Sequence, residues 1–253
     1  MSVELISTTQ AARLAGVGTS SIKRWADEGR LVCRKTAGGH RRFARDEVER
    51  VLRGGRDPDG WIERLLRGDA VAVEGGLLED RSRRGAWHAV CDGLGGVLEE
   101  LGARWQRGEL SVLQEHLVSE RLARAVGRIG DGLPLRPGAP RALLATADPA
   151  DEHPLGLALA ELALREAGWR TSWAGRRTPA AELAIAARDD LVDMVVLSAS
   201  VVARDRRLLG RVLGAVTRTG VRVAVGGAGA WPDAPAGAAR FHDFGSFSRW
   251  LAL

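Results

Sequence analysis

The C-terminal part of the chain alternates short apolar segments with amphipathic ones. Apolar runs of strand length recur after residue 140, and each is followed by a segment with helical spacing of its apolar positions. Apolar strands joined by helices are typical of a parallel sheet covered on both faces. We therefore expect a flavodoxin-like (Rossmann) α/β domain over residues 141–253. The expected strands are 142–147, 171–174, 193–197, 221–225 and an edge strand at 241–244, and the expected helices are 155–167, 178–188, 206–219 and 246–253.

The middle of the chain, residues 57–128, has helical periodicity throughout and predicts a four-helix bundle. Glycine pairs at 75–76 and 95–96 interrupt the heptads, which argues against a long coiled coil. Residues 129–140 hold three prolines and three glycines and are expected to be a linker. The four expected helices are 61–67, 70–79, 83–104 and 110–128.

Residues 1–56 are expected to form an all-α winged helix-turn-helix head. A short helix that Thr8 or Thr9 can cap is followed by a glycine-containing break at residues 16–18. A second, more polar helix then begins, and such a helix fits the major groove of DNA. The pattern as a whole predicts a multidomain protein, with the head, the helical bundle and the α/β domain in that order.

Positive charge is concentrated in the head. Residues 1–56 contain twelve Lys or Arg and six acidic residues, so they carry +6, whereas the rest of the chain sums to −1. Such asymmetry favours a polyanionic partner. Gly38-Gly39 suits a hairpin tip, and the basic residues His40, Arg41 and Arg42 just after it suit phosphate contacts. The alternative is a solvated basic loop on a small helical domain.

Composition and motifs exclude several classes of protein. No apolar run is long enough to span a membrane, and residues 1–10 do not form a signal peptide. Cys33 and Cys91 are too few for a disulfide framework or a structural zinc site. The chain shows no dinucleotide-binding glycine motif, no nucleophile elbow and no paired catalytic carboxylates. We expect a cytoplasmic protein that is not an enzyme and has no membrane partner.

Distinctive side chains follow the expected strands, at the edge where ligands bind in this class of sheet. Asp151 and His153 follow the first strand, Ser198 follows the third, and Gly226-Gly227 follows the fourth. An imidazole two residues after an aspartate is suited to axial metal binding, because the carboxylate can accept the other ring N–H. The alternative is a surface histidine at a helix N-terminus.

Residues 5–53, from ISTTQAARLAGVGTSSIKRWADEGRL to TAGGHRRFARDEV, resemble the winged helix-turn-helix of the MerR family of transcription regulators. The resemblance implies that the helix over residues 19–26 reads the major groove and that the protein acts as a homo-oligomer, a dimer or tetramer. The residues that the resemblance implies in contact with double-stranded promoter DNA are Thr19, Ser20, Ser21, Lys23, Arg24, His40, Arg41 and Arg42.

The pattern Asp-x-His-x-x-Gly at 151–156, together with Ser198 and Gly226-Gly227, resembles the cobalamin-binding Rossmann domain. The resemblance implies that His153 is the lower axial cobalt ligand and that Asp151 is its hydrogen-bond partner. It also implies that Gly156 and Ser198 line a slot for the benzimidazole tail. Gly226 and Gly227 would allow close approach of the backbone.

Trp105 precedes Glu115-His116 with nine residues between them. Taken alone, this spacing favours a core tryptophan and an exposed polar pair. The whole order of domains resembles the CarH/LitR class of adenosylcobalamin-dependent photoreceptor repressors, which implies that Trp105, Glu115 and His116 lie over the upper face of adenosylcobalamin. It further implies that this cofactor favours a DNA-binding oligomer and that photolysis of the cobalt–carbon bond releases DNA. The light sensors carry a histidine where this chain has Gln106, so the alternative is a light-independent cobalamin-sensing MerR-type regulator.

Overall fold

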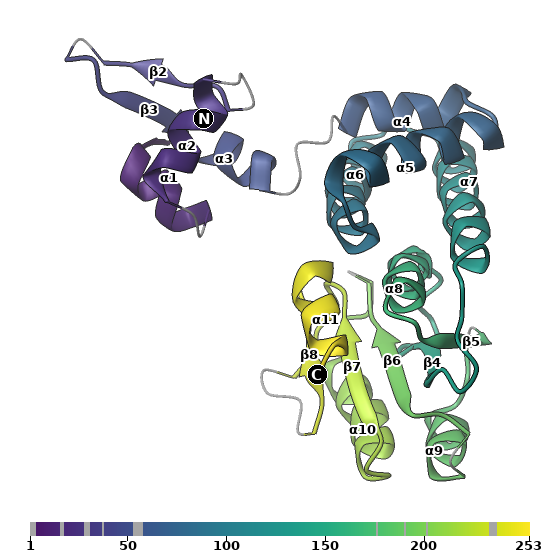
Figure 1. Cartoon of the computed structure of the whole chain (residues 1–253). Coiled ribbons are helices and arrows are strands. Elements are labelled where there is room, and N and C mark those ends of the chain that lie inside the picture. Colours follow the sequence, from purple (N-terminus) through teal and green to yellow (C-terminus); the bar gives the residue numbers. More distant parts are fainter. Residues whose placement is uncertain are drawn as a thin grey trace. The chain divides into compact units, whose positions relative to one another are not determined.

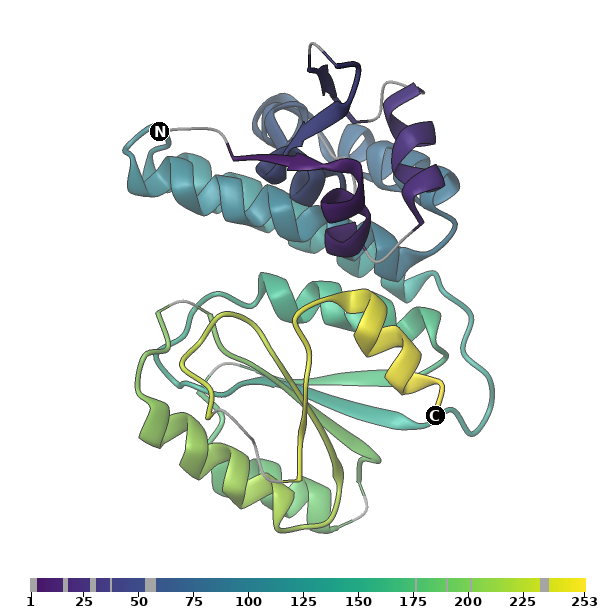
Figure 2. The ribbon, with the colours of Figure 1, turned by 90° about the vertical axis from the view of Figure 1, so that its left-hand side faces the viewer.

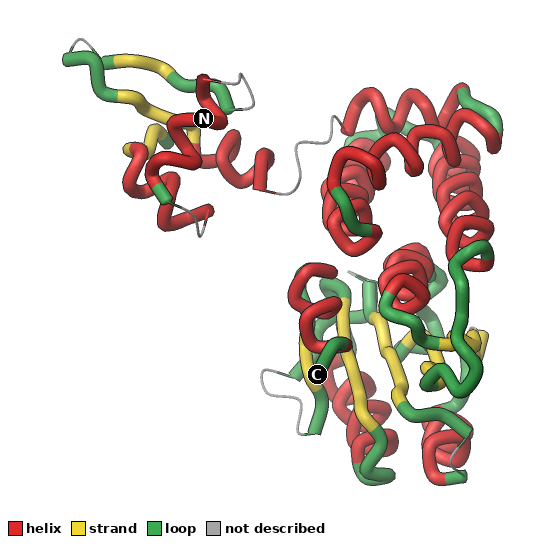
Figure 3. Tube along the Cα trace, in the orientation of Figure 1, coloured by secondary structure: helices red, strands yellow, loops and turns green. Residues whose placement is uncertain are grey.

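The chain folds into two compact units, Met1–Glu63 with Asp92–Glu109, and Arg64–Cys91 with Leu110–Leu253. Figure 1 labels the helices and strands in chain order, and Figure 3 draws helices in red and strands in yellow. None of the helices in the described ranges has the length and apolarity that crossing a membrane requires. The computed structural model describes residues 4–15, 18–27, 31–36, 38–52, 58–175, 177–189, 191–200, 202–232 and 237–253.

The head contains a three-stranded antiparallel sheet, so the expectation of an all-α head is wrong. Strand β3 (Arg41–Ala44) pairs with β1 (Leu5–Ser7) on one side and with β2 (Arg34–Lys35) on the other. Ile6 of β1 lies opposite Phe43 of β3, and both are buried. The strands are too short to show the alternation of apolar and polar residues by which a sequence predicts a strand.

Three helices pack with this sheet: α1 (Thr8–Ala15), α2 (Thr19–Asp27) and α3 (Arg45–Leu52). The break between α1 and α2 is predicted at Gly16, Val17 and Gly18, of which Gly16 and Val17 lie outside the described residues. One apolar core holds the helices and the sheet together, and it consists of Ile6, Ala11, Ala12, Ile22, Leu31, Phe43 and Val48.

Ser7 caps α1, in place of Thr8 or Thr9. The Ser7 hydroxyl accepts a hydrogen bond from the backbone N–H of Gln10 at 3.3 Å, and the Gln10 side chain accepts one from the N–H of Ser7 at 2.8 Å. This reciprocal pair satisfies two N–H groups that the start of a helix leaves without partners. The correct cap is therefore the serine three residues before a glutamine.

Four helices follow the head, and both glycine pairs lie inside helices, as the expected bounds place them. Gly75-Gly76 is in α5, where Gly76 is buried, and Gly95-Gly96 is in α6. Each glycine costs roughly 1 kcal/mol in a helix interior. The break expected at residues 80–82 is misplaced, because α5 continues to Arg84 and ends at Gly85, whose φ is 80°. The four helices are α4 (Pro58–Arg67), α5 (Ala70–Arg84), α6 (Trp87–Gln106) and α7 (Val112–Asp131).

The α/β part is a five-stranded parallel sheet of order β5-β4-β6-β7-β8. This is the flavodoxin-like strand order, as predicted. The strands are β4 (Arg141–Thr146), β5 (Arg170–Gly175), β6 (Met194–Ser198), β7 (Arg222–Gly226) and β8 (Ala239–Arg240), and the helices are α8 (Leu155–Glu166), α9 (Ala180–Arg188), α10 (Arg206–Thr217) and α11 (Phe244–Leu251).

The predicted edge strand at 241–244 is wrong, because β8 lies just before it. Phe241 instead joins an aromatic cluster with α11, and its ring centroid is 5.1 Å from that of Phe247 and 5.2 Å from that of Trp250. These apolar rings belong to a helix-facing core, so the apolar run marks the packing of α11 and not the position of the strand.

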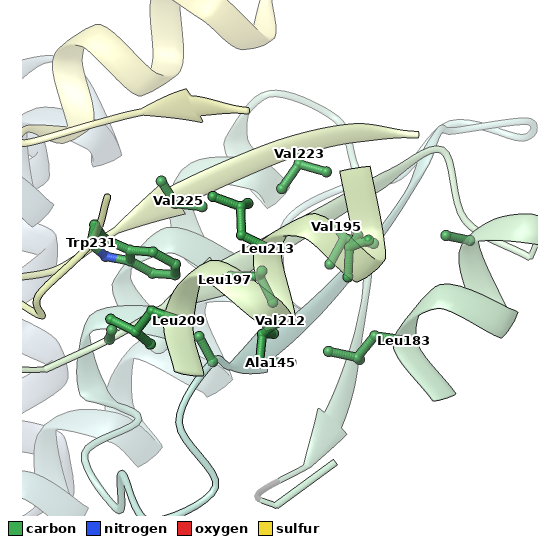
Figure 4. Close-up of a cluster of buried hydrophobic side chains, with 14 of the residues drawn as sticks. Ala145, Leu183, Val195, Leu197, Leu209, Val212, Leu213, Val223, Val225 and Trp231 are labelled. Carbon is green, nitrogen blue, oxygen red and sulfur yellow. The ribbon is translucent and has the colours of Figure 1, made fainter. Parts of the chain in front are cut away.

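Helices cover both faces of the sheet (Figure 2). One face packs against α8 and α11 through a core that includes Leu144, Leu157 and Phe247. The other face packs against α9 and α10, and Figure 4 shows Leu183 and Trp231 among the side chains of this second core. Because both faces are buried there, the central strands β4, β6 and β7 are largely apolar, as in other parallel sheets. The edge strand β5 is more polar and more exposed.

Glu166, at the end of α8, supplies the N-terminal cap of α6. Its carboxylate oxygens accept hydrogen bonds from the backbone N–H of Trp87 at 2.8 and 2.9 Å and from that of His88 at 3.1 Å. The guanidinium of Arg81 lies 3.3 Å from the same carboxylate. A side chain distant in sequence thus satisfies the free N–H groups at the start of a helix and places a negative charge there.

Replacing Glu166 with glutamine is expected to lower the free energy of unfolding by about 1 kcal/mol, because an amide has one acceptor oxygen and no charge for the helix N-terminus. Urea unfolding followed by circular dichroism measures this change. Glu120→Gln is the matched control, since Glu120 forms only an exposed pair with Arg124 on α7. Equal urea midpoints for the two variants would show that Glu166 is not a cap.

Candidate functional site

The candidate site lies at the carboxyl edge of the parallel sheet, where the strand order reverses. The chain leaves β4 in one direction to form β5 and later returns on its other side as β6, so β4 and β6 flank the switch point. Loops diverge there and leave a crevice in which ligands bind in open α/β sheets. In register across this edge are Thr146 of β4, Ser198 of β6 and Gly226 of β7.

A buried carboxylate joins the two loops at the switch point. Asp151, in the loop after β4, is 1% exposed. Its Oδ2 accepts a hydrogen bond from the backbone N–H of Ser200 at 2.6 Å, and its Oδ1 accepts one from the Ser200 hydroxyl at 2.8 Å. Ser200 follows β6, so the carboxylate holds the loop after β4 against the loop after β6.

The same carboxylate orients His153. Asp151 Oδ1 lies 3.1 Å from the backbone N–H of His153 and 3.2 Å from its ring Nδ1. A carboxylate only accepts hydrogen bonds, so the ring donates from Nδ1, and the neutral imidazole keeps its free lone pair on Nε2. The side chain of His153 is 58% exposed. The pair is therefore a buried carboxylate behind an accessible imidazole with a fixed tautomer, as a metal ligand requires.

Ser200 is the residue of this group that sequence reasoning misses. Both Ser198 and Ser200 follow the apolar run of β6, but only Ser200 contacts Asp151. A signal exists in the sequence, since a hydroxyl next to the ligand edge of a sheet can satisfy a buried carboxylate. The pairing itself is invisible there, because 48 residues separate Asp151 from Ser200.

Thr146 offers an unsatisfied hydroxyl at the same edge. Thr146 is 4% exposed, and its Oγ1 is buried without a hydrogen-bond partner among the described residues. A buried polar atom left unpaired costs about 1–3 kcal/mol. A hydroxyl in this state at the ligand edge is suited to a polar atom of a bound molecule, and this observation fits a site built to be filled.

The glycines of the site have different structural roles. Gly227 has a φ of 85°, and a Cβ atom there would lie 2.3 Å from the backbone oxygen of Ala199, so the packing of the loops already excludes a side chain. At Gly156, in the first turn of α8, a Cβ would meet nothing within 4 Å. Gly226 has only one ordinary contact, 3.9 Å from the oxygen of Phe241. Of these three glycines, Gly227 is thus the one that the chain's own packing requires.

The residues predicted from the helical block fall on two elements. Trp105, near the end of α6 in the first unit, is 49% exposed, so it is not a core tryptophan of that unit. Glu115 and His116 lie in the first turns of α7 and contact each other, with His116 Nδ1 2.7 Å from Glu115 Oε2. The Ser119 hydroxyl donates to the other oxygen of Glu115 at 2.7 Å. The imidazole of His116 is 68% exposed.

The basic residues of the head differ in how they are used. Thr19, Ser20 and Lys23 of α2 are exposed, whereas the side chains of Ser21 and Arg24 lie outside the described residues. His40 is exposed beside the turn that joins β2 to β3. Arg41 and Arg42 follow it on β3.

Arg41 is engaged within the head. Its guanidinium donates to the backbone oxygen of Lys23 at 2.9 Å and to Asp27 Oδ1 at 2.6 Å. The hydrogen bond to Asp27 raises the pKa of the Arg41 guanidinium above its ordinary value. For Arg42, no side-chain hydrogen bond or ion pair is present in the described part of the head. The two neighbouring arginines are thus in different states.

Two domain families match the chain. A helix-turn-helix domain matches residues 5–56, and a B12 binding domain matches residues 59–129. The solved structure of the Methanosarcina barkeri monomethylamine corrinoid protein superposes with a TM-score of 0.55 at 15% identity, covering 76% of this chain and 94% of that one. At this identity the likeness shows a shared fold alone.

Two relatives from Myxococcus xanthus are transcriptional repressors. The HTH-type transcriptional repressor CarA is 28% identical over an alignment 226 residues long, and the alignment covers 74% of this chain and 74% of CarA. The HTH-type transcriptional repressor CarH is 35% identical over 137 residues, which is 53% of this chain but only 45% of CarH. The chain therefore combines a helix-turn-helix domain with a B12-binding domain and is a homologue of the CarA and CarH transcriptional repressors.

Proposed function

We propose that this protein is a cobalamin-dependent transcriptional regulator that binds adenosylcobalamin through His153 and releases DNA in the light. The observation that carries the proposal is the buried Asp151 carboxylate behind the exposed His153 imidazole at the switch point of the sheet. This pair supplies one metal ligand in a defined tautomer. His153 would be the residue of the chain that holds the cobalt.

The remaining site residues would hold the cofactor around this bond. Gly156 and Ser198 would line the slot for the nucleotide tail, and the unsatisfied Thr146 hydroxyl would meet a polar atom there. Gly226 and Gly227 would leave room for the cofactor beside the loop after β7. We assign Trp105, Glu115 and His116 to the upper face, where the half-exposed indole would pack on the adenosyl group.

When bound, adenosylcobalamin would supply a cobalt–carbon bond that light breaks. The chain responds to the state of the upper ligand only if its assembled and dissociated forms contact that ligand differently. We assign this difference to Trp105, because an exposed indole loses or gains apolar burial when its partner changes. The adenosylcobalamin-bound chain is then a DNA-binding oligomer, a dimer or tetramer, and the illuminated chain dissociates.

For DNA, we assign the major groove to α2, through Thr19, Ser20, Ser21, Lys23 and Arg24. We assign His40 and Arg42, which lie at and just after the turn between β2 and β3, to contacts with the phosphate backbone. The net charge of +6 in residues 1–56 attracts the polyanion before any specific contact forms. Pairing of two heads in an oligomer would match a promoter with two half-sites.

Size-exclusion chromatography with absorbance detection tests this function on the full chain mixed with adenosylcobalamin in the dark and then under green light. We expect the corrin to co-elute with the protein and the dark species to be larger than the illuminated one. Co-elution with no change of size in light would contradict light release and favour a light-independent cobalamin sensor, the reading that Gln106 at the end of α6 favours. Absence of co-elution would contradict cobalamin binding itself.

A further inference from the structure

We infer that Arg41 positions the recognition helix α2 and does not bind a DNA phosphate, so it sets sequence specificity and not general affinity for DNA. This inference rests on the proposed DNA-binding function. It concerns a residue that charge and spacing alone assign to the phosphate backbone. The two roles differ in ways that binding measurements separate.

The guanidinium of Arg41 uses two of its nitrogens on α2. Nη1 donates to the backbone oxygen of Lys23, and Nη2 donates to the carboxylate of Asp27, one helical turn further on. The Arg41 side chain is 24% exposed, whereas that of Asp27 is 64% exposed. Arg41 therefore lies across the last turn of α2 with both Nη atoms engaged there, which is the fork geometry that distinguishes arginine from lysine.

The strand that carries Arg41 provides a fixed base for this contact. Arg41 pairs with Lys35 of β2, and two residues further along the same face of β3 lies Phe43, which is fully buried in a core with Ile22 of α2. Successive residues of a strand alternate between faces, so Arg41 is on the side of α2 and Arg42 is on the other side. Arg42 is thus the residue of β3 left for a phosphate.

The contact is favourable for a helix C-terminus. The last carbonyl groups of a helix carry partial negative charge and lack partners within the helix, so a guanidinium there is stabilising. Of the residues that would reach base edges, Thr19 and Ser20 lie in the first turn of α2, at the end opposite Asp27, and Lys23 lies at its middle. A nine-residue helix is roughly 13 Å long, so a tilt of about 10° at one end displaces the other by roughly 2 Å. Base contacts do not survive such a displacement.

The test compares two duplexes on the full chain with its cobalamin: one selected by the wild-type chain from a random library, and a scrambled duplex of equal length and composition. Fluorescence anisotropy gives each affinity over a range of KCl concentrations. Arg41→Lys keeps the charge but cannot reach both partners at once. We expect it to weaken binding to the selected duplex about tenfold, to change binding to the scrambled duplex less than about twofold, and to leave the salt slope unchanged.

Asp27→Asn weakens the contact from the other side, because the amide keeps an acceptor oxygen but loses the charge. We expect it also to lower the ratio of selected to scrambled affinity, although loss of a negative charge alone would raise both affinities. Arg42→Ala is the comparator for a phosphate contact, and it should weaken both duplexes alike and reduce the salt slope by about 0.9. Arg136→Gln, in an exposed segment before β4, controls for loss of any arginine.

Three results would overturn the inference: wild-type behaviour of Arg41→Lys on the selected duplex, equal weakening on both duplexes, or an Asp27→Asn variant that binds both more tightly with an unchanged ratio. A wild-type chain that selects no duplex would instead overturn the proposed DNA-binding function. Circular dichroism melting of each variant separates loss of positioning from loss of the fold, because Asp27 and Arg41 lie at the surface of the head.

Discussion

Replacing His153 with alanine is expected to abolish tight cobalamin binding, with a loss of affinity of more than a hundredfold. Removing a partner that merely orients a metal ligand costs about 10–100-fold, and removing the ligand itself costs more. His153 is the imidazole that Asp151 orients, with Nδ1 3.2 Å from the carboxylate and Nε2 free to bind. Titration of the variant with aquacobalamin, followed by absorbance and by co-elution on a desalting column, measures the loss.

His242→Ala is the matched control, because His242 is also an exposed histidine of the α/β part and lies outside the loops at the carboxyl edge of β4 and β6. Direct ligation is tested separately with added cob(II)alamin, whose electron paramagnetic resonance spectrum should show nitrogen coupling that changes when histidine is labelled with ¹⁵N. An alanine variant that binds aquacobalamin as tightly as the wild type would rule out His153 as the ligand. A spectrum unaffected by the label would do so too.

The fold of the α/β part could be predicted from the sequence because its signal is redundant. Each buried strand is a continuous apolar run, each helix has an apolar face, and alternation of the two allows few topologies. The head gave a weaker signal, since β1 and β2 are three and two residues long and are stabilised by their pairing with β3. Pairing between distant segments is a tertiary property that local patterns do not contain.

In the candidate site, too, contacts between residues close in sequence could be predicted, and contacts between distant elements could not. Asp151 and His153 are close in sequence, so their hydrogen bond could be anticipated from spacing alone. The contacts of Asp151 with Ser200 and of Arg41 with Asp27 join different elements, and only the folded chain brings them together. The charge of Arg41 suggested a phosphate contact, but charge does not say whether a partner already exists within the protein.

Replacing Asp151 with asparagine is expected to have the second-largest effect, because the carboxylate accepts four hydrogen bonds. Oδ1 accepts hydrogen bonds from the Ser200 hydroxyl, from the backbone N–H of His153 and from its ring Nδ1. Oδ2 accepts one from the backbone N–H of Ser200. An asparagine whose oxygen replaces Oδ1 turns its NH2 group toward the N–H of Ser200, so a buried donor loses its acceptor. We expect the free energy of unfolding to fall by about 1–3 kcal/mol and the affinity for aquacobalamin to fall by about 10–100-fold.

Urea unfolding and the absorbance titration measure these two losses separately. Ser200→Ala is the informative control, since it removes the hydroxyl hydrogen bond to Oδ1 and a long one that the hydroxyl accepts from the N–H of Val202 at 3.4 Å. It leaves the backbone N–H of Ser200 on Oδ2 and both contacts of Oδ1 with His153 intact. It should cost about 1 kcal/mol of stability and little affinity. If Asp151 only joins the two loops, affinity in the two variants should fall in proportion to their loss of stability. If Asp151 also sets the tautomer of His153, Asp151→Asn should lose far more affinity for aquacobalamin than Ser200→Ala relative to its loss of unfolding free energy. The same ratio of affinity loss to stability loss in both variants would contradict that role.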